Sequence, residues 1–319
     1  MSAQGTAAVA MAPEPSSRLR RGWQKFVKYL PLYVLLLPGI AYFLTFRYWP
    51  IYGLSMAFVD FKIFEGILGS PWVGLKHFES ILSSPLFMRS IRNTLVISVL
   101  RLVVGFPAPI ILALMLNELR FSGLKRIIQT ITYLPYFLSW VIIYGILLAF
   151  LSPSAGLVNQ WLGSMGASTI PFLTDKNWFL AVIIGSGVWQ GAGWGAIIYL
   201  AALANISPEL YEAATIDGAN RLQQIWHISI PGISSTIVLL LILNLGYLLD
   251  AGFGQIYIMY NPMVYETADI IDTWTFRNGI EQFRFSIGTA ASFFKSLVGL
   301  VLVLTANKLA KHYTDSGIW

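Results

Sequence analysis

Two long stretches without a charged side chain limit what this chain can fold into. No Asp, Glu, Lys or Arg occurs between Ile127 and Thr174, or between Asn177 and Pro208. Each stretch exceeds the roughly 20 apolar residues that cross a bilayer as a helix. Over the whole chain 56% of residues are apolar and 11% are charged, whereas soluble domains carry about 45–50% and about 25%. The sequence therefore predicts an all-α membrane protein and excludes a soluble enzyme, a coiled coil and a disordered chain.

Charge and cysteine content narrow the class further. The chain has a net charge of +6. Membrane proteins commonly carry such a charge because their cytoplasmic loops are rich in Lys and Arg, so no nucleic acid partner is needed to explain it. The chain has no cysteine, which excludes disulfides, thiolate nucleophiles and cysteine-based metal sites. Its three histidines, His77, His227 and His312, are dispersed without metal-ligand spacing, and no metal site is predicted.

About six apolar segments are predicted to be transmembrane helices. They cover approximately residues 29–49, 93–117, 127–151, 178–204, 232–250 and 285–307. Together they form a membrane domain at 29–308, between a basic tail at 1–28 and a second tail at 309–319. Segment 51–69 is ambiguous, because charged residues interrupt its apolar run. With the N-terminus inside, the inner segments carry more Lys and Arg than the longer outer loops. Both termini are therefore predicted to be cytoplasmic.

One predicted inner loop, residues 205–231, carries more acidic than basic residues, unlike the usual Lys- and Arg-rich inner loop. Its charged residues are Glu209, Glu212, Asp217 and Arg221. An acidic loop is poorly suited to lie on anionic lipid, so we expect it to bind a protein. Ser207 is a suitable N-cap and Pro208 suits the first helical position, while Gly218 can take the positive φ that ends a helix. The loop is therefore predicted to form an elbow of two short helices joined at Gly218.

The residues of this elbow resemble the EAA loop of permease subunits of binding-protein-dependent ABC importers. The matching residues are Glu212, Ala213, Ala214, Asp217, Gly218, Ala219, Ile228 and Pro231. Ile225 stands where the family often has Phe, a conservative departure. The resemblance extends from the first predicted span to Lys308, and segment Asn261–Ile280 resembles the lipoprotein-polysaccharide or multiple-sugar subgroup. The sequence as a whole resembles permease subunits of alginate importers.

This resemblance implies the ABC importer permease fold and a place in the bacterial cytoplasmic (inner) membrane. The implied partners are a second homologous permease subunit, two ATPase subunits, membrane lipid and an external solute-binding protein. The implied cargo is an oligosaccharide or polysaccharide, alginate or another uronate among them. Glu209 and the eight matching residues would couple this chain to one ATPase. The chain has no G-x-x-x-x-G-K-[ST] loop, so ATP and Mg²⁺ would be bound by the partner ATPase, and the chain alone is not an enzyme.

Polar residues in the fourth and fifth predicted spans are candidates for the substrate pathway. Gly187, Gly191 and Gly195 recur every four residues, a pattern typical of close helix packing. The candidate residues nearby are Trp189, Gln190 and Trp194, and those of the fifth span are Asn244, Tyr247 and Asp250. The last three are predicted to share one helical face. Each set either lines the pathway or contacts neighbouring helices.

Two cations lie well inside predicted spans, Arg101 in the second and Lys295 in the sixth, whereas Arg47 lies at the outer end of the first. A charge there costs at least about 2.5–3.5 kcal/mol on insertion scales, so each needs an anionic partner or a wet cavity. They either attract an acidic sugar or pair with Asp250 or with the partner subunit. The outer loops 50–92 and 250–284 either dock the binding protein or carry solvated charge.

Two other classes compete with an importer permease. An ion-coupled secondary transporter of a polar solute is expected to show inverted repeats and ion-coupling residues at broken helices. An intramembrane enzyme needs a convergent acid, base or nucleophile set. The sequence shows isolated charges within the spans and no clear repeat, so both alternatives have less support than the elbow motif gives the importer.

Overall fold

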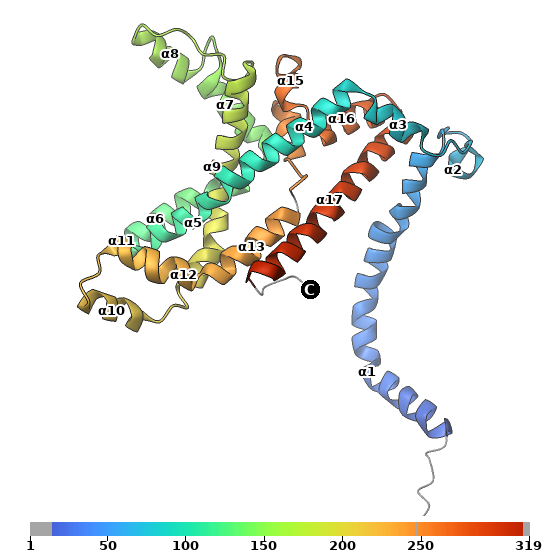
Figure 1. Ribbon diagram of the computed structural model, residues 1–319, viewed down its shortest axis with the longest axis horizontal. Helices are drawn as coiled ribbons and strands as arrows, with labels where there is room; N and C mark the ends of the chain where they lie inside the picture. Colours follow the sequence, from blue (N-terminus) through green and yellow to red (C-terminus); the bar gives the residue numbers. More distant parts are fainter. Residues whose placement is uncertain (1–14, 247, 315–319) are drawn as a thin grey trace, which may run out of the picture. The chain divides into compact units, whose positions relative to one another are not determined.

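The computed structural model describes residues 15–246 and 248–314, and the regular structure over these residues is helical (Figure 1). Two isolated β-bridges join Val59 with Trp72 and Lys62 with Gly66. The chain forms two compact units, Met1–Ser55 and Met56–Trp319. The all-α prediction is confirmed.

The first unit is built on α1 (Pro15–Phe43), the π-helical turn η1 (Leu44–Tyr48) and the beginning of the 3-10 helix η2 (Trp49–Phe58). Helix α1 starts within the predicted 1–28 tail and contains Pro31 and Pro38. The apolar segment Val27–Phe58 is long enough to cross a membrane. Its side chains are exposed over most of their length, as expected for a helix that packs against lipid.

The second unit contains the remaining helices. Its first half comprises α2 (Gly66–Gly69), α3 (Lys76–Leu82), α4 (Pro85–Leu100), η3 (Arg101–Gly105), α5 (Pro107–Asn117), α6 (Ser122–Tyr133), η4 (Leu134–Phe137), α7 (Trp140–Leu151), α8 (Leu157–Ser164) and α9 (Lys176–Leu203). Its second half comprises α10 (Pro208–Ile216), α11 (Arg221–Gln224), η5 (Ile225–Ser229), α12 (Ile230–Gly232), α13 (Ser234–Gly246), α14 (Phe253–Met259), η6 (Pro262–Val264), α15 (Tyr265–Ala268), α16 (Ile271–Thr275), η7 (Phe276–Glu281) and α17 (Phe285–Thr314). Segments η3, η5 and η7 are π-helical.

Among the described residues, four helical segments are long and apolar enough to span a membrane, and the number is six if each of two bent pairs forms one span. The four are Val27–Phe58, Pro85–Asn117, Lys176–Leu203 and Phe285–Thr305. The predicted third span is bent by 108° between Ser122–Phe137 and Trp140–Leu151. Pro135 lies in η4 and lacks a backbone donor, and the Ser139 hydroxyl then caps α7 by accepting from Ile142 N at 3.4 Å. Near the predicted fifth span, Arg221–Gly232 bends by 61° into Ser234–Gly246.

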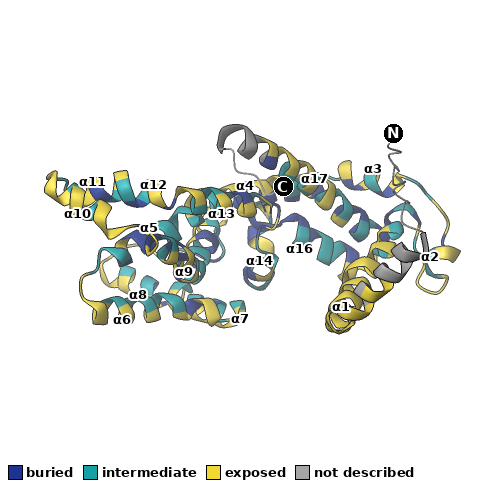
Figure 2. Ribbon diagram, turned by 90° about the horizontal axis from the view of Figure 1, so that it is seen from below, coloured by how far each residue is buried: buried dark blue, intermediate teal, exposed yellow. Residues whose placement is uncertain are grey.

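Helix α9 lies at the centre of the second unit and packs against α5, α6 and η3. One apolar cluster joins Phe179 and Ile183 of α9 with Ile256 and Met259 of α14. A second cluster surrounds Tyr199 near the other end of α9, and a third joins α4, α16 and α17. Figure 2 shows buried residues along these helices, whereas α10 and α11 are mostly exposed.

The glycines of α9 do not pack as their four-residue spacing predicts. A Cβ at Gly193 would collide with the backbone of Thr132 and lie 3.0 Å from Tyr133 N, and one at Gly195 would lie 2.9 Å from Pro109 Cγ. A Cβ at Gly191 would meet nothing within 4 Å. The tight contacts are therefore at Gly193, against α6, and at Gly195, against Pro109 of α5, on two different faces of α9.

Candidate functional site

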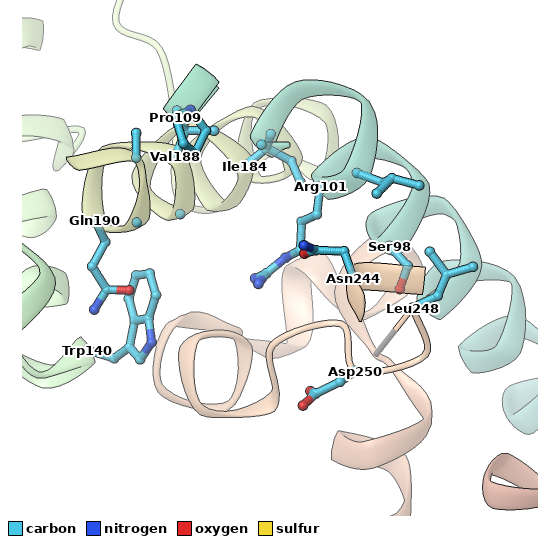
Figure 3. A pocket seen from close by; sticks show the side chains of 15 residues that line it. Ser98, Arg101, Pro109, Trp140, Ile184, Val188, Gln190, Asn244, Leu248 and Asp250 are labelled. Carbon is cyan, nitrogen blue, oxygen red and sulfur yellow. The ribbon is translucent and has the colours of Figure 1, made fainter. Parts of the chain in front are cut away.

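A cavity of about 340 Å³ lies between α4, η3, α9, the start of α7 and the chain that follows α13 (Figure 3). Its polar lining residues include Ser98, Arg101, Gln190, Asn244 and Asp250. Trp140 supplies an aromatic surface, and Gly187 and Gly191 leave room on α9. Four of the predicted pathway residues are thus brought together from three separate parts of the chain.

Arg101 begins the π-helical turn η3, and its side chain points into the cavity (Figure 3). Its Nη2 donates to Gln255 Oε1, and its guanidinium lies where a Cβ would stand at Gly252. Gly252 has φ +82°, so both the backbone conformation and the space favour glycine. Arg101 Nε and Ser98 Oγ are buried without a hydrogen-bond partner among the described residues, and buried polar atoms normally have one.

Gln255 fixes the position of Arg101 and was not identified from the sequence. The buried side-chain amide donates from Nε2 to Ile183 O at 2.8 Å and to Ser186 Oγ at 2.9 Å. Because both amide hydrogens are used on α9, Oε1 must face Arg101. Gln255 lies in a segment that the sequence assigned to an outer loop. The signal that was available is a lone amide within the apolar run Phe253–Met259.

Gln190, Asn244 and Asp250 each make one hydrogen bond with the backbone. Gln190 Nε2 donates to Leu138 O at 3.1 Å, at the break between η4 and α7. Asn244 Nδ2 donates to Leu240 O at 2.8 Å, and Asp250 Oδ1 accepts from Gly252 N at 3.3 Å. These bonds leave the Gln190 and Asn244 carbonyl oxygens and one Asp250 oxygen available to hydroxyl groups.

The predicted shared face of Asn244, Tyr247 and Asp250 is wrong for Asp250. Helix α13 ends at Gly246, so Asp250 lies beyond the helix, and the turn that follows returns it to the cavity. Tyr247 lies outside the described residues. Helical spacing does not continue past a helix end, and the sequence offered no clear stop signal before Asp250.

Three other predicted pathway residues do not line this cavity. Trp194 stacks on Tyr136 with ring centroids 4.7 Å apart, and Trp189 is half exposed. Lys295 Nζ contacts both carboxylate oxygens of Asp272, at 2.7 and 2.6 Å. Lys295 therefore has an anionic partner within this chain, and that partner is Asp272 of α16 and not Asp250.

The predicted elbow is present, with Gly218 at its joint. Gly218 has φ +81°, its N–H bonds to Thr215 O at 3.1 Å, and Ala219 N bonds to Ala214 O at 2.8 Å. These two bonds form a Schellman cap that ends α10. Ser207 is the N-cap residue of α10, as predicted, in an extended conformation, although its hydroxyl makes no cap bond. The second helix starts instead with a capping box between Asn220 and Gln223.

A hollow of about 290 Å³ lies inside the elbow. It is lined by Ala214, Asp217, Gly218, Ala219, Gln223, Gln224, His227 and Ile228. Buried Gln224 braces it by donating to Thr215 Oγ1 at 2.9 Å. The other predicted coupling residues, Glu209, Glu212, Ala213 and Pro231, are exposed around it. Exposed Ile216 and Leu222 add apolar surface at the tip, which is suited to contact with a protein.

The segment between α14 and α17 is folded, and one ion pair, Asp269 with Arg277, lies within it. Asp269 is buried and accepts from Arg277 at 3.1 and 2.6 Å. Burial opposes the charge of Arg277, but the bonds and charge of Asp269 outweigh it and hold the pKa of the guanidinium above its ordinary value. Asn93 donates to the Asp269 and Glu266 carbonyls, both at 3.1 Å. These contacts attach the segment to α4.

Within the part of the chain that the structure describes, no three His, Asp or Glu side chains gather in a group that could hold a metal ion. The arrangement of the cavity and of the elbow suits binding and movement of a polar solute.

Residues 105–314 match the family model of the binding-protein-dependent transport system inner membrane component. The chain belongs to this family. It is 45% identical over 295 residues to the polygalacturonan/rhamnogalacturonan transport system permease protein YteP of Bacillus subtilis (strain 168), covering 92% of each chain. It is also 44% identical over 288 residues to protein LplB of the same strain, covering 90% of this permease and 91% of LplB.

Solved structures agree with this assignment. The permease matches a bacterial ABC transporter involved in the import of the acidic polysaccharide alginate, with TM-score 0.86 and 45% identity over 92% of this chain and 99% of that chain. It also matches a bacterial alginate ABC transporter in complex with an alginate pentasaccharide-bound periplasmic protein, with TM-score 0.86 and 44% identity over 93% and 99%.

The permease is therefore an inner-membrane, non-catalytic subunit of a binding-protein-dependent ABC importer for polysaccharides or oligosaccharides. The family and fold predicted from the elbow motif are confirmed. The ion-coupled secondary transporter and the intramembrane enzyme are excluded.

Proposed function

We propose that this permease passes acidic oligosaccharides of the uronate class through the cavity at Arg101. The observation that supports this proposal is a guanidinium that points into the cavity and is held there by a neutral amide, with its Nε buried and unpartnered among the described residues. A guanidinium binds a carboxylate through two parallel hydrogen bonds. The neighbouring oxygens of Gln190, Asn244 and Asp250 then accept sugar hydroxyls, and Trp140 packs on a pyranose face.

The relatives support the acidic class of cargo. One solved transporter of similar sequence imports the acidic polysaccharide alginate, and YteP is a permease for polygalacturonan and rhamnogalacturonan. Alginate itself, or an oligosaccharide derived from it, is the cargo that we propose for this chain.

The elbow at Gly218 is proposed to transmit ATP-driven closure of a partner ATPase to the spans. Its exposed acidic and apolar residues surround a hollow, and α13 follows directly after it. ATP and Mg²⁺ are bound by two ATPase subunits in this proposal. A second permease subunit completes the pathway, a solute-binding protein delivers the sugar on the opposite side, and both termini of this chain are cytoplasmic.

Uptake by proteoliposomes that contain the complete transporter tests the proposed cargo. Arg101→Gln removes the charge, and loss of a charge-assisted hydrogen bond costs about 1.5–3 kcal/mol. We expect uptake of a uronate oligosaccharide to fall at least about tenfold, whereas uptake of a neutral oligosaccharide of equal length changes less than about twofold. Arg92→Gln is the matched control, because Arg92 is exposed on α4 and does not line the cavity. Equal losses for both sugars would assign Arg101 to structure and refute the acidic specificity.

A further inference from the structure

Helix α8 and its C-cap residue, Met165, expose a stripe of three large apolar side chains. Leu157, Trp161 and Met165 are 55%, 61% and 63% exposed, and their spacing of four residues places them on one face of the helix. Figure 1 shows α8 standing away from the helices around α9, at the end of α7. The stripe is therefore presented to whatever surrounds the permease at this position.

Specific hydrogen bonds hold the stripe in this orientation. Asn159 lies on the opposite face of α8, is buried, and donates to Ser152 O at 3.1 Å and to Ile170 O at 2.9 Å. Its Oδ1 accepts from Ile170 N at 2.9 Å. At the other end of α8, Gly166 takes φ +78° and Ala167 N bonds to Leu162 O at 3.0 Å. Three large apolar side chains thus face outward beside Gln160 and Ser164, while Asn159 faces inward with the part-buried Val158 and Leu162.

The residues that precede and follow the stripe along the chain include no charged side chain. The charge-free stretch Ile127–Thr174 contains all of α8, and charge returns only at Asp175 and Lys176, where α9 begins. The exposed polar residues of this stretch, Gln160 and Ser164 among them, are all neutral. A charge-free surface of this kind suits a hydrocarbon boundary.

The position of α8 along the spans agrees with such a boundary. The hydrogen bonds to Ile170 tie α8 to the segment that leads into α9. The 28 residues of α9 place its first turn roughly 40 Å from the elbow, at 1.5 Å per residue. This length matches the full thickness of a bilayer with its headgroups. Exposed Leu148 and Phe150 of α7 also continue the apolar surface onto α8.

We propose that α8 is an interfacial helix that lies in the lipid headgroup region on the side of the membrane opposite the elbow. Trp161 sits at the headgroup level, where indoles are enriched, and Leu157 and Met165 reach the acyl chains. Interfacial helices usually add Lys and Arg on the polar face to attract anionic lipid. Helix α8 has none, so its contact is with zwitterionic and anionic lipid alike.

Nitroxide labels at single cysteines test this proposal cleanly, because the chain has no native cysteine. The variants are Leu157→Cys, Trp161→Cys and Met165→Cys, with Gln160→Cys as the matched control. Gln160 is also exposed, adjoins Trp161 and lies outside the stripe. The complete transporter, with cysteine-free partner subunits, is placed in phosphatidylcholine nanodiscs. Collision rates of each label with oxygen, which concentrates in lipid, and with a water-soluble nickel chelate are then measured.

We expect the three stripe labels to collide several-fold more with oxygen than with the nickel chelate, and the label at 160 to show the reverse. Preference for nickel at the stripe would place it in water, and protection from both reagents would place it against the partner permease. A change at the stripe on addition of the solute-binding protein would make it a docking surface for that protein. Each of these three results overturns the proposal. ATPase activity of each labelled complex reports assembly, and Leu157→Cys and Met165→Cys decide the matter if Trp161→Cys fails to assemble.

Discussion

Gly193→Ala is expected to separate α9 from α6, because no side chain fits at their crossing. A Cβ at Gly193 would collide with the carbonyl of Thr132 and lie 3.0 Å from Tyr133 N. Both neighbours are backbone atoms of a helix, so neither can rotate away as a flexible side chain does. The two helices must shift or tilt to admit the methyl group.

The magnitude follows from two opposing effects. Replacing Gly by Ala in a helix interior stabilises the helix by about 1 kcal/mol. Overpacking a close-packed contact costs about 1–3 kcal/mol and occasionally more, and a collision with backbone belongs at the upper end. The net effect expected for Gly193→Ala is a destabilisation of about 2 kcal/mol. Gly191→Ala makes the same chemical change two residues away, where nothing lies within 4 Å, and is expected to stabilise by up to about 1 kcal/mol.

Thermal unfolding of the purified complex, followed by tryptophan fluorescence, measures this difference. A gap of about 3 kcal/mol corresponds to transition temperatures on the order of 5–10 °C apart for a chain of this size, with Gly193→Ala the lower. Gly191→Ala is the internal control for helix propensity. Equal transition temperatures for the two variants would refute the close approach of α9 to Thr132.

Substitutions at three further places test other parts of the permease. Gly218→Asn should keep sugar-stimulated ATPase activity near that of the unsubstituted protein, whereas Gly218→Val should lower it without preventing membrane insertion. The reason is that a left-handed conformation at φ +81° costs an ordinary residue about 1–2 kcal/mol. Full stimulation in Gly218→Val would contradict this role of Gly218. Lys295→Ala and Asp272→Ala should each lower the transition temperature and the double variant less than their sum, with a coupling of about 0.5–3 kcal/mol; additive losses would show that the pair contributes nothing. Gln255→Leu removes the amide that bonds to Ile183 O and to Arg101. It should lower the transition temperature, and it should weaken uptake of the uronate more than uptake of a neutral sugar. Unchanged selectivity would mean that Gln255 does not position Arg101.

The elbow could be predicted from the sequence because its geometry is local. A helix that ends on Gly218 needs only the residues within one turn, and the Schellman bonds of Gly218 and Ala219 reach no further than Ala214. The apolar spans were predictable for a similar reason, since length and hydropathy are properties of a segment. Ser207 is the N-cap residue as predicted, but its hydroxyl makes no cap bond, because an N-cap preference does not fix a side-chain rotamer.

The cavity was only partly predictable because tertiary contacts decide it. The four-residue spacing of Gly187, Gly191 and Gly195 indicated a packing face, but Pro109 and the backbone of Thr132 lie against Gly195 and Gly193. Gln255 was missed because its partners Ile183 and Ser186 are far away in sequence. Periodicity gives the faces of a helix and does not say which neighbour each face meets.

Arg101 and Lys295 are both cations within predicted spans, but the structure gives them different partners. Lys295 contacts both oxygens of Asp272, so an anionic ligand would have to displace a carboxylate before it could bind. Arg101 is held by the neutral amide of Gln255, and it forms no salt bridge among the described residues, although Asp250 lines the same cavity. A neutral acceptor fixes the direction of the guanidinium and leaves it without a carboxylate in direct contact, which is the condition for binding one. The acidic specificity proposed for this permease therefore belongs to Arg101, and Lys295 supports the contact between α16 and α17.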